Sequence, residues 1–278
     1  MEYNLIWQTQ EGDQTNFEYE YLTNVIFKNL NIIKHFDNGQ LSKVMDNSII
    51  IYSNNQNSPS LEFINYLNEF IKNNYTFYLV HLSNENLGQN TNYYDNAKNV
   101  FRNYYDSNIE NKNVIYIPLG FKSGFYNNDF NSNDYKIKKY DFSFIGQLKS
   151  DRHELHNLIE NEKSFIHLTN SWNCVTSLNP TQISNIYKET KFVPCPMGWS
   201  HPDSFRIMEA LEWYSIPIIK KYENFDYHNF VYGETPLPKV NSWDELKNFS
   251  IMDDSAYSKL FDEVFSWYQT FREKKYLI

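Results

Sequence analysis

The chain has little cysteine and no excess of positive charge. Its 278 residues include two cysteines, Cys174 and Cys195, whose separation matches neither a metal-ligand spacing nor a disulfide framework. The two could pair with each other, but two reduced and buried thiols are the default expectation. The formal net charge of −9 at pH 7 leaves no general basic surface for nucleic acid, so we expect no nucleic-acid partner.

The sequence also lacks long hydrophobic runs. No stretch approaches the roughly 20 apolar residues that cross a membrane. Residues 1–10 lack the charged and apolar regions of a signal peptide. We therefore expect no integral membrane segment and a soluble protein of the cytoplasmic type, unless an anchor has been trimmed from the chain.

Apolar and aromatic residues are abundant enough to form cores. Hydrophobic residues make up 41% of the chain and aromatic residues 18%, which rules out wholesale disorder. The length suits roughly two domains. Short apolar runs alternate with segments of helical period, and this pattern predicts a doubly wound parallel sheet. In the first half we expect strands at residues 3–7, 31–36, 48–52, 76–82 and 113–118, and helices at residues 17–30 and 60–73.

A second set of strands and helices follows a polar stretch. Residues 120–140 are rich in Asn, Asp, Ser and Lys and form the best linker candidate, so we place the domains at residues 1–135 and 136–278. In the second domain we expect strands at 140–146, 164–168, 191–194 and 216–219, helices at 151–160, 180–190, 203–213, 242–249 and 253–274, and an aromatic loop at 224–238. The last helix is long enough to pack back on the first domain.

The most informative stretch is residues 191–220. It predicts a short strand, a tight loop around Gly198, a helix and a second buried strand. The helix would begin near Pro202, where a first helical position tolerates proline, with Ser200 or His201 as its cap.

Two charged residues of this helix indicate a phosphate site. Arg206 and Glu209 lie in its first two turns, three positions apart and therefore on one face. Free N–H groups and the helix dipole attract an anion to such a start, and an arginine adds a forked donor for phosphate. A carboxylate one turn on can accept both hydroxyls of a ribose. The alternative interpretation is an ordinary strand–helix–strand unit with an exposed Arg–Glu pair.

A further candidate phosphate site lies where the strand at 140–146 ends in Gly146. Glycine lets backbone approach a ligand, and Lys149 and Arg152 would face a diphosphate at the start of the next helix. The alternative is an ordinary turn with two exposed basic residues. After the next strand, Trp172 could stack on a base, although packing in the core or at its rim explains this residue equally well.

Two stretches of the first half carry residues suited to acid–base chemistry. His81 and Glu85 lie at the C-terminal end of an expected central strand, where ligands gather in open α/β sheets. Either could act as general base for a sugar hydroxyl, although a polar turn explains them as well. Arg102 precedes the strand at 113–118, and an amphipathic segment with a solvated arginine is its alternative interpretation.

Several motifs resemble those of the exostosin-like glycosyltransferases of family 47. The donor-binding segment of that family is similar to FVPCPMG at residues 192–198, SFRIMEAL at 204–211 and IPII at 216–219. First-domain motifs of the family resemble HLSNEN at 81–86 and FRNYY at 101–105, which precedes IPLG at 117–120. Asn84 stands where an acid is expected, which leaves Glu85 and His81 as candidates for the base. The resemblance spans residues 79–219.

This resemblance implies an α/β protein of the GT-B type, in which two Rossmann-like doubly wound domains face each other across a cleft. The first domain would take the acceptor and the second the nucleotide sugar, expected to be a UDP-sugar. Relatives are usually Golgi lumenal. The implied catalytic residues are Glu85, His81 and Arg102, and the implied donor-binding residues are Gly146, Gln147, Lys149, Arg152, Asn170, Trp172, Pro196, Gly198, His201, Ser204, Arg206 and Glu209.

The expected function is that of an inverting glycosyltransferase. It would move a sugar from a nucleotide diphosphate sugar to a hydroxyl of a glycan or glycoconjugate, with no cofactor and no metal. Three alternatives stay open. The first is another GT-B transferase with a GDP-fucose-type donor, and the second is an inactive transferase fold that binds carbohydrate. The third is a generic α/β protein with a structural Arg–Glu pair.

Overall fold

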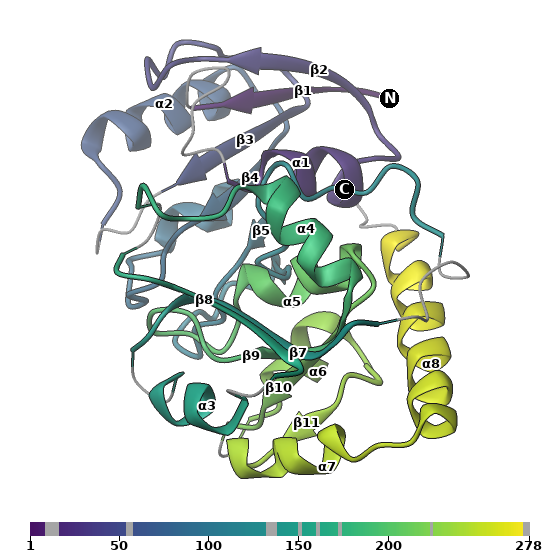
Figure 1. Ribbon diagram of the computed structural model, residues 1–278. Coiled ribbons are helices and arrows are strands. Elements are labelled where there is room, and N and C mark those ends of the chain that lie inside the picture. Colours follow the sequence, from purple (N-terminus) through teal and green to yellow (C-terminus); the bar gives the residue numbers. More distant parts are fainter. Residues whose placement is uncertain are drawn as a thin grey trace.

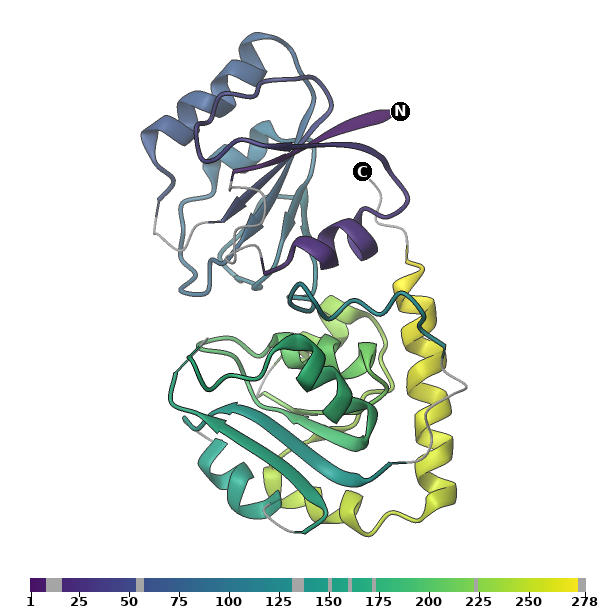
Figure 2. The same cartoon turned by 45° about the horizontal axis from the view of Figure 1, so that its top comes forward.

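The computed structural model describes residues 1–8, 17–53, 58–131, 138–149, 152–159, 162–171, 174–222 and 225–274. The chain forms two units, each built on one sheet, that lie one above the other (Figure 2). Every described pair of strands in both sheets is parallel. The expected domain boundary between residues 135 and 136 falls outside the described residues.

The first unit contains a six-stranded sheet in the order β2-β1-β3-β4-β5-β6 (Figure 1). Its strands are β1 (Glu2–Trp7), β2 (Asn31–Phe36), β3 (Ser48–Ser53), β4 (Phe77–Leu82), β5 (Val100–Arg102) and β6 (Val114–Tyr116). All strands expected in the first half are confirmed. A solvated side chain was the alternative interpretation of Arg102. That alternative is wrong, because Arg102 lies in strand β5 and is fully buried.

Helices cover both faces of this sheet because successive side chains of a strand point to opposite sides. Ile50 and Leu79 pack in one cluster with α2 (Leu61–Lys72), whose first turn is capped by Ser60 as expected. Ile49 and Val80 instead pack in the other cluster, with α1 (Tyr19–Tyr21) and the π-helical turn η1 (Leu22–Ile26). The helix expected at residues 17–30 is therefore shorter than predicted. A 3-10 turn, η2 (Asn92–Asn96), follows β4.

The second unit contains a five-stranded sheet in the order β11-β10-β9-β7-β8. Its strands are β7 (Tyr140–Gln147), β8 (Ser164–Thr169), β9 (Thr190–Cys195), β10 (Ile216–Lys220) and β11 (Lys239–Val240). In both sheets the second strand lies on one side of the first strand and the third strand on the other. Each sheet therefore has a topological switch point beside its first strand, and ligands of open α/β sheets bind at the carboxyl ends of the strands there.

The helices of the second unit are α3 (Arg152–Ile159), α4 (Pro180–Lys188), α5 (Phe205–Glu212), α6 (Tyr227–Tyr232), η3 (Trp243–Glu245), α7 (Leu246–Ser250) and α8 (Asp254–Arg272). Two expectations are corrected. Helix α5 begins at Phe205 with Ser204 as its N-cap residue, so neither Ser200 nor His201 caps it. The segment 224–238, expected as a loop, contains α6, which begins at an Asp226 cap.

Helix α8 links the two units. Its apolar side, with Phe261, Phe265 and Tyr268, is buried against the second unit. It runs along the side of that unit and ends beside the first (Figure 2), where Lys28 Nζ lies 2.8 Å from Glu273 Oε1. None of the helices in the described part of the chain is long and apolar enough to cross a membrane.

Candidate active site

A cavity of about 610 Å³ lies between the two units. One wall comes from the second unit, at the carboxyl ends of β7 and β9 and the start of α5. The other wall comes from segments of the first unit that follow β1, β4, β5 and β6. The volume is within the range of small-molecule sites, and the position is the switch point of the second sheet.

Arg206 forms the centre of the second-unit wall. Its Nη2 donates to the Ile145 carbonyl oxygen at 3.0 Å, and its Cζ lies 5.1 Å from the centroid of the Phe144 ring. Gly146 makes this approach possible, since a Cβ on it would lie 3.0 Å from Arg206 Nη2. The φ of Gly146 is 145°, a conformation that side chains rarely adopt. The guanidinium is thereby fixed at the carboxyl end of β7 and lines the cavity.

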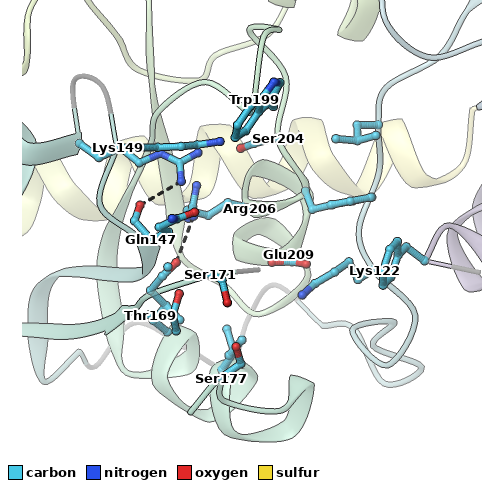
Figure 3. A pocket seen from close by; sticks show the side chains of 18 of the residues that line it. Lys122, Gln147, Lys149, Thr169, Ser171, Ser177, Trp199, Ser204, Arg206 and Glu209 are labelled. Atoms are coloured by element: carbon cyan, nitrogen blue, oxygen red, sulfur yellow. Dashed lines mark hydrogen bonds between the residues drawn. The ribbon is translucent and has the colours of Figure 1, made fainter. Parts of the chain in front are cut away.

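Lys149 adds a second cation at the same edge (Figure 3). Its Nζ lies 4.4 Å from the centroid of the Trp199 ring, which is 71% exposed at the rim of the cavity. Burial lowers the pKa of Lys149, the Arg152 and Arg206 guanidiniums lower it further, and the Glu85 carboxylate opposes them. Mutual repulsion among three cations is relieved when an anion binds between them, so this edge is suited to a phosphate group.

Arg152 donates hydrogen bonds to backbone carbonyl oxygens of two different loops at the edge of the cavity. Its Nη1 donates to the Gln147 carbonyl oxygen at 3.1 Å and its Nη2 to the Met197 carbonyl oxygen at 2.7 Å. These bonds join the turn after β7 to the loop after β9. Arg152 lines the cavity, but two of its N–H groups already hold these two loops together.

Glu209 places an unpaired acceptor in the cavity. Its side chain is 5% exposed, and no described residue donates a hydrogen bond to its Oε1. The backbone N–H of Lys122 does donate to the carboxylate. Burial raises the pKa of Glu209, and Lys122 and Arg206 oppose the rise. A buried acceptor without a partner is costly, so this oxygen is suited to hydroxyl groups of a bound ligand.

Ser204 contributes a second unpaired group at the start of α5. Its hydroxyl lines the cavity and finds no hydrogen-bond partner among the described residues. Ser204 is the N-cap residue but its side chain makes no capping hydrogen bond, while its own N–H donates to Asp203 Oδ1 at 2.9 Å. The Ser204 hydroxyl is therefore a buried, unsatisfied group at the helix N-terminus, where anions bind.

The far end of the cavity is lined by small hydroxyl residues and by apolar side chains. Thr169, Ser171 and Ser177 lie there below Arg206 and Glu209 in Figure 3. Gln147 Nε2 donates to the Asn170 carbonyl oxygen at 2.8 Å, and the Asn170 side chain itself does not line the cavity. Trp172, the expected stacking residue, lies outside the described residues.

Glu85 comes to the cavity from the first unit and contacts the loop after β9. Its Oε1 accepts the Trp199 N–H at 3.2 Å, and its carbonyl oxygen accepts the Ser200 hydroxyl at 2.7 Å. Gly198 permits the contact, because a Cβ there would lie 3.3 Å from Glu85 Oε1 and 2.9 Å from the Asp203 carbonyl oxygen. Glu85 therefore closes one end of the cavity.

His81 and Arg102 lie behind this wall rather than in it. Both are buried, and neither lines the cavity. Arg102 donates to the Tyr104 carbonyl oxygen at 3.0 Å, the Tyr94 hydroxyl at 3.0 Å and Asn84 Oδ1 at 2.6 Å. His81 Nδ1 contacts the Tyr94 hydroxyl and Arg102 Nη1. This network fixes the loop that carries Glu85, and Asn84 supplies its acceptor where an acid had been expected.

Pro196 and His201 are also buried outside the cavity lining. The His201 ring packs at 5.0 Å from the Tyr104 ring and 4.6 Å from the Tyr227 ring. Burial lowers the pKa of His201 to about 4, so the imidazole is neutral at pH 7. Its position makes it a contact between the two units.

Two carboxyl groups of this region, those of Asp203 and Glu18, were not among the site residues predicted from the sequence. Asp203 accepts bonds from the Leu119 N–H at 2.9 Å, the Ser204 N–H at 2.9 Å, the Tyr227 hydroxyl at 3.2 Å and the Tyr232 hydroxyl at 2.8 Å. It thereby ties the start of α5 to the segment after β6. Burial raises its pKa to about 6. The only available signal was an acidic side chain at the first position of the helix expected at residues 203–213.

Glu18 is the second missed group. It lines the cavity on the first-unit side and is 6% exposed. Burial raises its pKa to about 7, and its own backbone N–H opposes the rise. Nothing in the local sequence distinguishes it from its neighbour Glu20, which bonds the Gly124 N–H at 2.7 Å outside the cavity.

The comparisons with known proteins concern the fold. No protein-family model matches the chain, and no curated protein sequence matches it significantly. A solved α1,3-fucosyltransferase aligns with 99% of this chain and 91% of its own at 12% identity, with a TM-score of 0.52. MurG of Acinetobacter baumannii aligns with 99% of this chain, over 95% of the MurG chain, at 8% identity and with a TM-score of 0.39.

Two parallel sheets of the same strand order, a cavity between them and this structural likeness agree on one architecture. The chain has the two-domain α/β architecture of the GT-B fold.

Proposed function

We propose that the protein is a glycosyltransferase that moves a sugar from a nucleoside diphosphate sugar to a hydroxyl of a glycan or glycoconjugate. The observation that carries the proposal is the pairing of cations with an unpaired buried acceptor in the cavity. Arg206 and Lys149 line one part, Glu209 lines another, and the buried Glu209 Oε1 has no hydrogen-bond partner among the described residues. A nucleoside diphosphate presents anionic oxygens followed by ribose hydroxyls, in the same succession.

In this proposal the diphosphate binds at the edge formed by Arg206, Lys149 and the N-terminus of α5. Charge on the leaving diphosphate grows in the transition state, and fixed cations that face it lower the barrier. The Arg206 guanidinium is held by Ile145 and needs no reorganisation to do this. Within the described ranges, no group of three or more metal-ligating side chains is arranged to hold an ion. Transfer without a metal remains part of the proposal.

Glu209 binds the ribose and the far end of the cavity takes the base. Two lone pairs of a carboxylate oxygen accept two hydroxyl donors at once, and Glu209 Oε1 is buried without a hydrogen bond from the described residues. Thr169, Ser171 and Ser177 supply hydroxyls for the edge of the base. The reaction also requires a proton acceptor on the acceptor side, where Glu85 and Glu18 line the cavity.

The resemblance to family 47 supports a UDP-sugar and inversion at the anomeric carbon. The structural likeness to an α1,3-fucosyltransferase supports a second candidate, a fucosyl donor carried on a guanine nucleotide. Both candidates use the same diphosphate and ribose contacts. They differ in the base and in the sugar.

A thermal-shift panel of UDP, GDP, CMP and ADP, each with EDTA and with manganese, tests the proposal. A ligand that binds only the folded state raises the melting temperature by mass action. Stabilisation by UDP in EDTA supports a metal-independent UDP-sugar enzyme, and stabilisation by GDP alone supports the fucosyl donor. If no nucleotide shifts the melting temperature, the proposal is contradicted and an inactive carbohydrate-binding fold takes its place.

A further inference from the structure

We infer that Glu18 is the general base that accepts the proton of the acceptor hydroxyl, and that Glu85 positions the loop around Trp199. The inference rests on the proposed function and assigns a role that neither the sequence motifs nor the comparisons give.

Glu18 lines the cavity from the first unit, close to the start of α5. The ring of its neighbour Phe17 packs at 6.3 Å from the ring of Phe205, the first residue of α5. Arg206 is the next residue of that helix. The start of α5 and the segment that carries Glu18 are therefore in direct contact, and both line the same cavity.

A short chain of contacts fixes Glu18 relative to Glu209. The Phe17 carbonyl oxygen accepts the Ser123 N–H at 2.6 Å and the Ser123 hydroxyl at 3.1 Å. The preceding residue, Lys122, donates its backbone N–H to Glu209. Two adjacent residues thus bond the proposed ribose-binding carboxylate and the segment that carries Glu18. In the proposed arrangement, a base on this segment reaches the sugar of a donor whose nucleotide lies against α5.

The surroundings of Glu18 suit a group that must accept a proton and release it. Burial raises its pKa to about 7, near the pH at which a general base is most effective. The backbone N–H of Glu18 itself opposes this rise in the pKa. The titratable side chain beside it is Tyr104, which also faces Glu85 and Asp203, and burial together with these three carboxylates raises the pKa of its hydroxyl.

Glu85 is less suited to this role although it lines the same wall. Its Oε1 already accepts the Trp199 N–H at 3.2 Å, and its charge faces Lys149. This oxygen is thereby engaged in holding the loop after β9. Its backbone carbonyl also holds Ser200. Glu85 is therefore a positioning residue for the loop that carries Trp199.

The proposed step balances as a single displacement. The acceptor oxygen forms a bond to the anomeric carbon while its proton moves to the Glu18 carboxylate. The bond from that carbon to the diphosphate oxygen breaks, and its electron pair leaves with the diphosphate. Glu18 ends protonated and returns the proton to solvent after the products depart.

The test uses the full chain and measures release of UDP from UDP-sugars and of GDP from GDP-fucose, with water as the acceptor. Glu18→Gln should lower kcat by about 10²- to 10⁴-fold, the usual contribution of a general base. It should leave the affinity for the nucleoside diphosphate within about twofold. Glu20→Gln is the matched control, because its carboxamide oxygen can still accept the Gly124 N–H outside the cavity, and it should retain activity.

Two further readouts separate a base from a structural residue. The kcat of the wild type should fall below about pH 7 as Glu18 is protonated, and this acid limb should vanish in Glu18→Gln while it persists in Glu85→Gln. Sodium azide should restore turnover in Glu18→Ala and give the glycosyl azide, since azide needs no deprotonation to attack the anomeric carbon.

The outcomes distinguish this inference from the proposed function. If the wild type releases nucleotide and Glu18→Gln keeps kcat within about tenfold with an unchanged acid limb, Glu18 is not the base and the proposed function stands. The inference also fails if azide restores Glu85→Ala instead. If the wild type releases nucleotide from none of the donors, both the proposed function and the inference are overturned.

Discussion

Arg206 lies directly over the backbone of Gly146. Its Nη2 is 3.0 Å from the Ile145 carbonyl oxygen and would be 3.0 Å from a Cβ at position 146. The charged end of α5 and the carboxyl end of β7 therefore meet only because residue 146 has no side chain. Both elements border the switch point of the second sheet, where the cavity lies.

Gly146→Ala should weaken nucleoside diphosphate binding by displacing Arg206. The substitution also strains a φ of 145°, which should lower the free energy of unfolding by about 1–3 kcal/mol. Gly233→Ala is a matched control, since its φ is 81° and no atom lies within 4 Å of its added Cβ. Urea unfolding and calorimetric titration of UDP and GDP measure the two effects. Equal affinities in the two variants would contradict the proposed contact.

Glu209→Gln should weaken nucleotides but not inorganic pyrophosphate. The carboxamide can accept the Lys122 N–H but then presents an amide nitrogen where Oε1 faced the cavity. Loss of one hydroxyl acceptor should cost about tenfold in affinity for UDP or GDP. Pyrophosphate has no ribose, so its affinity should stay within about twofold. A parallel loss for pyrophosphate would place Glu209 at the phosphates instead.

Asp203 should make stability depend on pH between about 4 and 6. Its folded-state pKa of about 6 lies above the ordinary value of 3.8, so the folded chain keeps the proton where the unfolded chain has lost it. The stability that this group contributes is fully present below pH 3.8 and is lost as pH rises through about 6. The change should amount to about 3 kcal/mol at most.

The measurement compares urea unfolding of the wild type and Asp203→Asn from pH 4 to 7.5. The asparagine does not titrate, so the difference between the two proteins isolates the Asp203 contribution. Asp203→Asn should be less stable overall, because an amide nitrogen cannot accept the Leu119 N–H or a tyrosine hydroxyl proton. A difference that stays constant across this range would contradict the raised pKa.

The sequence predicted the elements that carry the site because they have strong local signals. Prolines and breakers bound the strand–loop–helix–strand unit around Arg206, and apolar runs mark the buried strands. Strand β5 and helix α6 were missed because they are short, three and six residues, and carry no clear period. The cap of α5 was misplaced because Ser204, rather than Ser200 or His201, is its N-cap residue, with an extended backbone at φ −150° and ψ 147°.

Long-range contacts explain what could not be predicted. The sequence left Arg102 as either a catalytic residue or a solvated arginine, and only the tertiary structure brings Asn84, Tyr94 and the Tyr104 carbonyl oxygen around it. Glu18 and Glu20 are two acids of one short segment, and burial of one of them depends on contacts with residues 122–124, far along the chain. Local sequence shows the residue types available to a site but not which of them the fold buries.

Calorimetric titration of the wild type and Arg206→Ala with UDP and with GDP in EDTA tests the central claim most directly. The wild type should bind at least one of the two, and Arg206→Ala should bind it about 10- to 150-fold more weakly, as expected for a lost hydrogen bond to a charged group. The variant should unfold at the same urea concentration within experimental error. Equal affinity in the two proteins, or no binding of either nucleotide to the wild type, would contradict a diphosphate site in this cavity.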